Sequence, residues 1–220
     1  MPIQNLFFPT LTRQAYYPNY GHYSAYKDYV REDSQYRCVY CDVHENELNR
    51  DINTRYEKMS IDHFRPKSLY PHLERNPHNL VLACQDCNHN KQDDFPAFGR
   101  PDGNSVDGVA GYVDPFGVNR NNYFEINHEG ELIAKQHPAD YMIRVLILNG
   151  VYKKKVRKRR IQLMENCELL DEFFKSEIDK LENMISNANE DQKKAMNEKL
   201  LNLQTMKVLL LSIRQLVELY

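Results

Sequence analysis

Long hydrophobic runs are missing from this sequence, as is a basic N-terminal stretch followed by an apolar one. A membrane-spanning helix needs about eighteen consecutive apolar residues, so both absences argue against a membrane span and a secretory leader. Cysteine is scarce as well: four of the five cysteines form two Cys-x-x-Cys pairs, unlike the disulfide framework of a small secreted protein. We therefore expect a cytoplasmic protein with no membrane contact.

The composition is that of a globular protein. Hydrophobic residues make up 41% and charged residues 27% of the 220 positions, and the formal net charge is only −2. This length allows one compact domain, or a small domain with a helical extension, and the weak net charge identifies no partner.

Four parts follow from the apolar spacing and the turn-forming residues. Short strands are expected at Met59–Phe64 and from Leu80. A β-hairpin is expected further along the chain, and glycine at 130 favours its turn. The predicted parts are an N-terminal helical and aromatic segment (1–36, helix near Tyr23–Glu32), a zinc-stapled unit (37–98), a loop and β-hairpin (99–138) and a helical C-terminal region (139–220).

The two Cys-x-x-Cys pairs predict a metal site. Two residues between cysteines let both sulfur atoms reach one ion, and two such pairs close a tetrahedral zinc shell. With four thiolates bound, the ion has no open position and is structural, so a hydrolytic zinc is disfavoured. The predicted zinc ligands are Cys38, Cys41, Cys84 and Cys87.

The segment between the pairs contains residues suited to phosphodiester hydrolysis. His63 follows Asp62 at the end of a predicted strand, and Asn88 opens a predicted helix. An imidazole is a suitable base near neutral pH, and carboxylate and amide oxygens are ligands that Mg²⁺ prefers. Each residue also has a structural explanation, as a turn former, a core histidine or a helix cap. Their joint order between two cysteine pairs favours the catalytic interpretation.

This order of residues resembles the HNH, or ββα-metal, endonucleases over roughly Cys38 to Lys91. The resemblance implies an α+β fold, with a zinc-stapled ββα-metal unit, a β-hairpin and a helical C-terminal region. It implies that His63 is the general base, that Asp62 and Asn88 bind a catalytic Mg²⁺ or Mn²⁺, and that Asn79 orients the loop bearing His63.

Two details of this site stay open. Many members of the family carry histidine directly after the last cysteine, whereas Asn88 stands there and His89 follows, so either residue is a possible metal ligand; the Cys-Asn-x-x-Lys spacing favours Asn88. Candidate phosphate contacts near the motif are Arg65, Lys67 and Lys91.

The run KKKVRKRR at 153–160 predicts a helix with positive charge on all sides. Phosphate contact by Lys154, Arg157 and Lys158 competes evenly with a solvated or partner-facing surface.

The last two predicted helices, near 166–186 and 190–218, form a helical hairpin with an apolar stripe. Packing on the chain's own core, docking of another protein and a homo-oligomer seam are all compatible with it.

A wider and less specific resemblance covers most of the first 160 residues. The segments Asp62–Ser68 and Asn79–Cys84, Asp114-Pro115, the hairpin and the segment Ile143–Asn149 are similar to HNH effectors of bacterial anti-phage systems of the Septu and retron-associated types. That resemblance implies an ATPase partner. DNA is expected over RNA as the substrate, but a motif that binds only phosphate and metal does not encode this choice. The alternative function is a zinc-stabilised nucleic-acid-binding or assembly module without catalysis.

Overall fold

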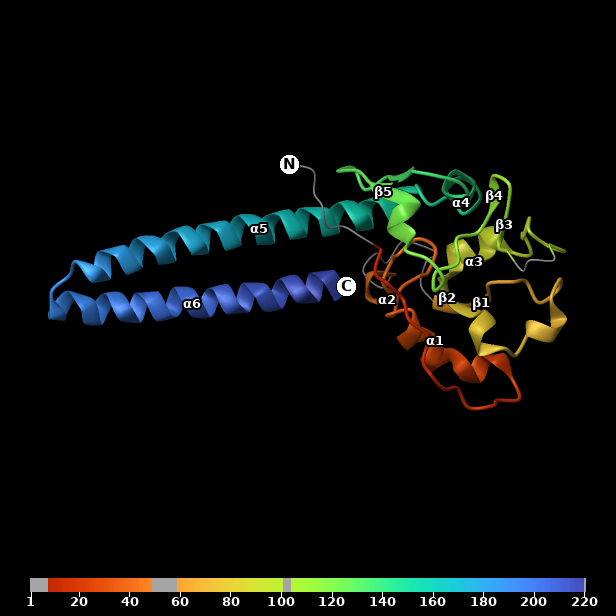
Figure 1. Cartoon of the computed structure of the whole chain (residues 1–220), viewed down its shortest axis with the longest axis horizontal. Coiled ribbons are helices and arrows are strands. Elements are labelled where there is room, and N and C mark those ends of the chain that lie inside the picture. The colour runs from red at the N-terminus through yellow and green to blue at the C-terminus, as the bar shows by residue number, and fades with distance from the viewer. Residues whose placement is uncertain (1–7, 49–58, 101–103, 220) are drawn as a thin grey trace. The chain divides into compact units, whose positions relative to one another are not determined.

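The computed structural model describes residues 8–48, 59–100 and 104–219 (Figure 1). The α-helices are α1 (Lys27–Asp33), α2 (Glu45–Leu48), α3 (Gln85–Lys91), α4 (Ala139–Val145), α5 (Val151–Ser186) and α6 (Glu190–Leu219). The strands are β1 (Met59–His63), β2 (Leu80–Cys84), β3 (Val106–Asp107), β4 (Ala110–Gly111), β5 (Phe124–Ile126) and β6 (Leu132–Ala134). The fold is therefore α+β, as predicted.

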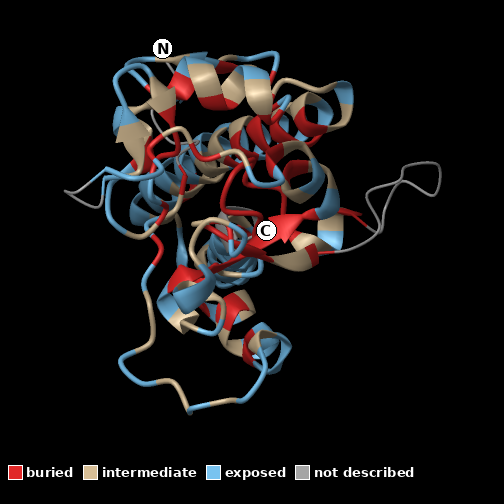
Figure 2. Cartoon of the chain, turned by 90° about the vertical axis from the view of Figure 1, so that its right-hand side faces the viewer, coloured by how far each residue is buried: buried red, intermediate tan, exposed pale blue. Residues whose placement is uncertain are grey.

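Strands β1 and β2 form an antiparallel pair that runs directly into α3. Met59 lies opposite Cys84 and His63 opposite Leu80. The apolar segment of β2 is buried along its whole length, and Figure 2 shows buried residues, in red, gathered in the interior around such segments. Helix α3 contacts both strands. This arrangement brings the start of β1, the end of β2 and the start of α3 together, and it places His63, at the end of β1, beside the start of β2.

The predicted hairpin is confirmed as β5 and β6, with Gly130 in the turn at a φ of +74°. A side chain at this position is excluded twice, by the positive φ and by space: a Cβ atom on Gly130 would lie 2.3 Å from the backbone oxygen of Lys154. The hairpin turn therefore packs directly on the first turns of α5. The predicted surface connection before it contains one small ladder, β3 with β4.

The basic run differs from the expectation of charge on all sides. Lys153, Arg157 and Arg160 are buried, because spacings of four and three residues place them on one face of α5. The Arg157 guanidinium donates to the backbone oxygens of Gly130 at 2.6 Å and Leu148 at 2.8 Å. One face of this helix is therefore built into the fold, and only the remainder of the run is at the surface.

By their contacts the residues divide into two compact units, Met1–Lys158 and Arg159–Tyr220. The second unit consists of the rest of α5 and the antiparallel α6, so the predicted helical hairpin is present (Figure 1). Among the described residues, no helix has both the length and the apolar character that crossing a bilayer requires.

Candidate active site and metal centre

Four buried cysteines form a compact cluster. The Sγ atoms of Cys38, Cys41, Cys84 and Cys87 all lie within 4.8 Å of one another, and Cys41 and Cys84 are 3.7 Å apart. A zinc ion with Zn–S bonds of about 2.3 Å separates its sulfur ligands by about 3.8 Å, so the donor set and its spacing fit tetrahedral zinc. The cluster is therefore compatible with the predicted zinc site.

Local structure explains why these sulfur atoms converge. Cys38 and Cys41 lie on a tight turn in which Asp42 donates its backbone N–H to the Cys38 oxygen, with Asp42 at a φ of +65°. Cys84 ends β2 and caps α3, and its sulfur accepts the backbone N–H of Cys87 at 3.5 Å. The cluster therefore fastens the first turn to the strand–helix junction.

The thiols of the cluster do not share one pKa shift: hydrogen bonds to the other cysteines raise the pKa of Cys84, and burial raises that of Cys87. Burial raises the pKa of the Cys41 thiol, but hydrogen bonds among the four cysteines and the charge of Lys153 outweigh burial and bring that pKa well below its ordinary value. A lowered thiol pKa favours the thiolate, which is the form that ligates zinc.

Two buried cations lie near this cluster, and sequence reasoning assigned neither to it. Burial lowers the pKa of Lys153, yet the thiols of Cys87 and Cys41 and the ion pair with Asp86 reverse this and raise it above its ordinary value. Burial lowers the pKa of Arg120 to about 10, and its guanidinium donates to the Val39 oxygen at 2.6 Å. Positive charge thus surrounds a set of ligands that would carry negative charge.

Asp62 is held on one face of β1 by two partners from the cysteine-bearing elements. Its carboxylate accepts the Tyr40 hydroxyl at 2.6 Å and lies 3.4 Å from the Lys91 ammonium, which also donates to the His63 backbone oxygen at 3.0 Å. Burial raises the pKa of Asp62, and the charge of Lys91 opposes that shift. Tyr40 was missed from the sequence, although its place between Cys38 and Cys41 was the available signal.

Lys91 was predicted as a phosphate contact, and the structure gives it a different position. Its side chain is fully buried, and its ammonium lies beside the carboxylate of Asp62. Arg157, also predicted as a contact, is fully buried too, with its guanidinium on backbone oxygens. In this fold neither cation is at a surface where a nucleic acid could touch it.

His63 follows Asp62 and so points to the opposite face of the strand. Its Nε2 donates to the backbone oxygen of Glu74 at 2.9 Å, and the ring packs edge-on against Tyr23 with 4.9 Å between centroids. A hydrogen fixed on Nε2 leaves Nδ1 as the nitrogen with a free electron pair. The ring is 8% exposed.

Asn79 bridges the loop after His63 back to the start of β2. Its side-chain oxygen accepts the Arg65 N–H at 2.9 Å, its amide donates to the Arg65 oxygen at 2.9 Å, and its backbone oxygen accepts the Phe64 N–H at 2.8 Å. The position of His63 at the end of β1 is thereby linked to β2.

Asn88 lies beside the same face of β1 as Asp62. Its amide donates to the Ser60 hydroxyl at 2.9 Å, and Ser60 and Asp62 share a face because strand side chains alternate. His89 is exposed and lies on another side of α3. This geometry favours Asn88 over His89 as the residue facing Asp62.

The other predicted contacts lie nearer the surface. Lys67 pairs with Glu74 at 3.3 Å, and the Arg65 guanidinium lies over the Phe95 ring at 5.2 Å. Lys154 and Lys158 pair with hairpin carboxylates, Glu131 at 2.9 Å and Glu129 at 2.7 Å. Nucleic-acid contact by these four residues stays a prediction.

Together, the fold and the cluster define an α+β protein with a buried four-cysteine site compatible with zinc. Over part of its length the chain is similar to "Septu protein PtuB" of Bacillus thuringiensis, with 38% identity over 69 residues. The match covers 30% of this chain and 24% of that relative. No protein-family model matches the chain, and no solved structure gives a significant match. The predicted resemblance to Septu-type proteins is supported in part, while HNH membership stays a prediction.

Proposed function

We propose that this protein is a metal-dependent HNH endonuclease that hydrolyses phosphodiester bonds of nucleic acids. The observation that carries the proposal is the imidazole of His63: its Nε2 donates to the Glu74 oxygen, which leaves Nδ1 as the nitrogen able to accept a proton from water. The bond to Glu74 sets this tautomer, and because His63 is only 8% exposed, its ring has little room to turn away from that bond.

The arrangement of elements supports the same proposal. The antiparallel pair β1 and β2, the intervening loop latched by Asn79 and the following α3 match in order what an HNH unit requires. The four-cysteine cluster fastens α3 to the turn that carries Tyr40. Asn79 is then a positioning residue, since its bonds hold the backbone next to His63.

Residues that would hold a catalytic Mg²⁺ or Mn²⁺ are Asp62 and Asn88. The amide nitrogen of Asn88 is engaged with Ser60, so its oxygen is the atom left to coordinate, and Asp62 lies on the same side of β1. Tyr40 and Lys91 orient the carboxylate, and the Lys91 charge favours its ionised form. A bound divalent cation would offset the negative charge that develops on the phosphate in the transition state.

Within this proposal, the biological role is that of a nuclease effector in a bacterial anti-phage complex of the Septu type, working with an ATPase partner. The similarity to Septu protein PtuB supports the role. The ATPase partner rests on the family resemblance alone, and the cleavage assay decides between DNA and RNA.

A second candidate function is a zinc-stabilised binding or assembly module without catalysis. It is favoured by the burial of the candidate site: His63 is 8% exposed beneath Tyr23, and Asp62 already has a cationic neighbour in Lys91.

Cleavage assays on the full chain separate the two functions. The purified protein is incubated with DNA and with RNA in Mg²⁺ or Mn²⁺, and then with EDTA. We expect His63→Ala to lower the cleavage rate by about 10²- to 10⁴-fold, the usual contribution of a general base. His89→Ala is the matched control, because this exposed histidine lies one residue beyond Asn88.

Zinc content and circular dichroism should be unchanged in both variants. A folded His63→Ala protein that cuts as fast as the parent would exclude the catalytic role of His63. A parent that binds nucleic acid but never cuts it would favour the binding module.

A further inference from the structure

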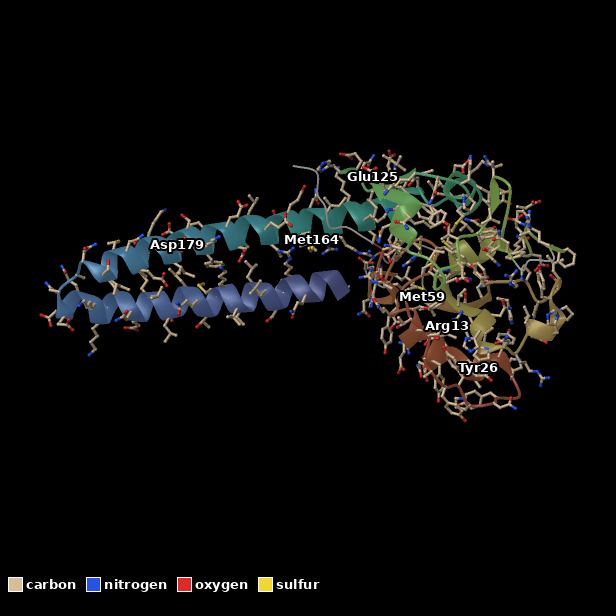
Figure 3. The ribbon with its side chains drawn as sticks, viewed as in Figure 1. Arg13, Tyr26, Met59, Glu125, Met164 and Asp179 are labelled. Carbon is tan, nitrogen blue, oxygen red and sulfur yellow. The ribbon has the colours of Figure 1, made fainter. Side chains whose placement is uncertain are left out.

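The helical hairpin of the second unit has an internal seam. Side chains at heptad spacing face across it, and α5 and α6 are aligned by two ion pairs, Asp171 with Lys207 and Glu168 with Arg214, each at 3.7 Å. Figure 3 shows side chains of both helices extending into the space between them. The seam positions are Met164, Cys167, Asp171, Phe174, Ile178, Leu181 and Ile185 on α5, and Lys193, Met196, Leu200, Leu203, Lys207, Leu210 and Arg214 on α6.

Much apolar surface remains outside this seam. Leu163, Leu170, Phe173 and Met184 are spaced by seven, three and eleven residues, so they form a line along α5 beside the seam positions. Because α6 is antiparallel and Asp171 faces Lys207, the handedness of the helices places a line from α6 on the same side of the hairpin. We call this side the apolar flank; its members are Leu163, Leu170, Phe173, Met184, Met206, Leu209 and Ile213, each between 41% and 59% exposed.

We infer that the apolar flank is a self-association surface, on which a second copy of this chain completes a four-helix bundle. Seven large, half-exposed side chains would bury on the order of 600 Å² per copy, and their neighbours bring this close to the roughly 800 Å² per partner of a stable interface. A two-fold axis brings the same flank of each copy together, so one patch serves both sides. An apolar patch of this size lies at the upper end of the range of about 300–600 Å² for the largest patch on a monomeric protein.

The charged residues that border the apolar flank are compatible with a second copy of the same chain. Glu177 and Lys180 on α5, which pair with each other at 2.7 Å, and Glu198 and Lys199 on α6 carry no net charge together. Two identical flanks therefore meet without net repulsion.

The opposite side of the hairpin also carries exposed apolar residues, Leu201, Val208 and Leu211 of α6, but its charges are not balanced. There α5 presents Glu172, Asp179 and Glu182 beside the base Lys175, while Glu168 pairs with Arg214. Two copies facing each other through that side would bring like charges together, which costs free energy. Self-association is thus directed to the apolar flank, independently of any nuclease activity.

The test measures the mass of the full chain in solution. Light scattering after size exclusion should give twice the 26.1 kDa of one chain for the parent. Leu170→Glu, in the middle of the apolar flank, should give the mass of one chain, because two buried carboxylates would face each other across the two-fold axis. Leu201→Glu is the matched control: this leucine is also exposed but lies on the other side of α6, and the variant should stay dimeric.

A second variant guards against misfolding. Phe173→Gln removes apolar area from the flank without adding charge, and circular dichroism reports whether the helices persist. We expect it to raise the dimer dissociation constant by at least tenfold with unchanged helicity. A monomeric parent, or a Leu170→Glu protein that stays dimeric, would overturn the proposal. A parent that is monomeric alone and binds a different protein through this flank would overturn it as well.

Discussion

The two compact units treat charged and apolar side chains in opposite ways. The first unit buries cations such as Lys91, Arg120 and Arg157, whereas the second leaves Leu170 and Phe173 half exposed. Burying a cation is unfavourable unless carbonyl oxygens or anions surround it, so each buried charge fixes a particular geometry. The first unit is therefore organised around buried polar groups with fixed partners, whereas the second keeps large apolar side chains at its surface.

The largest loss of structure is expected when a cysteine of the cluster is replaced. Cys84→Ser removes one thiolate, and a structural zinc contributes on the order of 10 kcal/mol of apparent binding free energy in small zinc domains, so we expect the first unit to lose its zinc and its ordered structure. Metal analysis and circular dichroism measure both, and helicity from the second unit should persist.

Cys167→Ser serves as the control, because Cys167 is buried in the hairpin and lies outside the cluster. Equal zinc content in parent and Cys84→Ser proteins would contradict a zinc site. Loss of all helicity in Cys84→Ser would break the distinction between the units.

The next effect concerns the buried arginine of α5. Arg157→Met leaves the oxygens of Gly130 and Leu148 without their donor, so we expect the free energy of unfolding to fall by about 3 kcal/mol. Urea denaturation measures it.

Lys158→Met is the matched neighbour, since Lys158 pairs with Glu129 at the surface and should cost no more than about 0.5 kcal/mol. An Arg157→Met protein as stable as the parent but weaker in binding nucleic acid would restore the prediction of Arg157 as a contact.

A smaller effect tests how the cysteine turn supports Asp62. Tyr40→Phe removes the hydroxyl that donates to this carboxylate, and loss of such a supporting hydrogen bond costs about 10- to 100-fold in metal affinity. Binding of Mn²⁺, followed by its paramagnetic resonance signal, provides a readout that does not depend on cleavage.

The control is Tyr141→Phe, which removes an equivalent bond to Asp94, a carboxylate outside the candidate site. Both variants should keep their zinc. Equal Mn²⁺ affinity in the parent and Tyr40→Phe would show that Tyr40 does not position a metal ligand.

The smallest change in stability is expected at the surface ion pair between Glu131 and Lys154. Hydrogen bonds from Lys154 and Asn127 lower the pKa of Glu131 below its ordinary 4.5. A carboxyl group with a lowered pKa stabilises the fold above the unfolded-state value, and this stability is lost as the pH falls through the folded-state value. We expect the melting temperature of the parent to fall slightly more than that of Glu131→Gln on acidification below pH 4.5.

Glu125→Gln, on the same hairpin, is the comparison for this titration. If Glu131→Gln and the parent lose the same melting temperature over this interval, the pair with Lys154 does not contribute to stability.

Much of the first unit could be predicted because its signals are local. The spacing of Cys38 and Cys41, the apolar run of β2 and the glycine at 130 each fix a short-range geometry. The prediction for the basic run was wrong for the same reason. The residue types show that the run is positively charged, but which of its side chains are buried depends on the hairpin turn that packs against α5.

The sequence by itself determined which groups are available: four thiols in two pairs, Asp62 beside His63, and two helices with an apolar stripe. Only the tertiary structure decided which of them meet. Tyr40 and Lys91 reach Asp62 because the cysteine turn and α3 converge on β1 from distant positions in the chain. Local patterns encode backbone conformation, whereas a buried hydrogen bond or ion pair forms only where separate elements pack together, and that packing has no short-range signature.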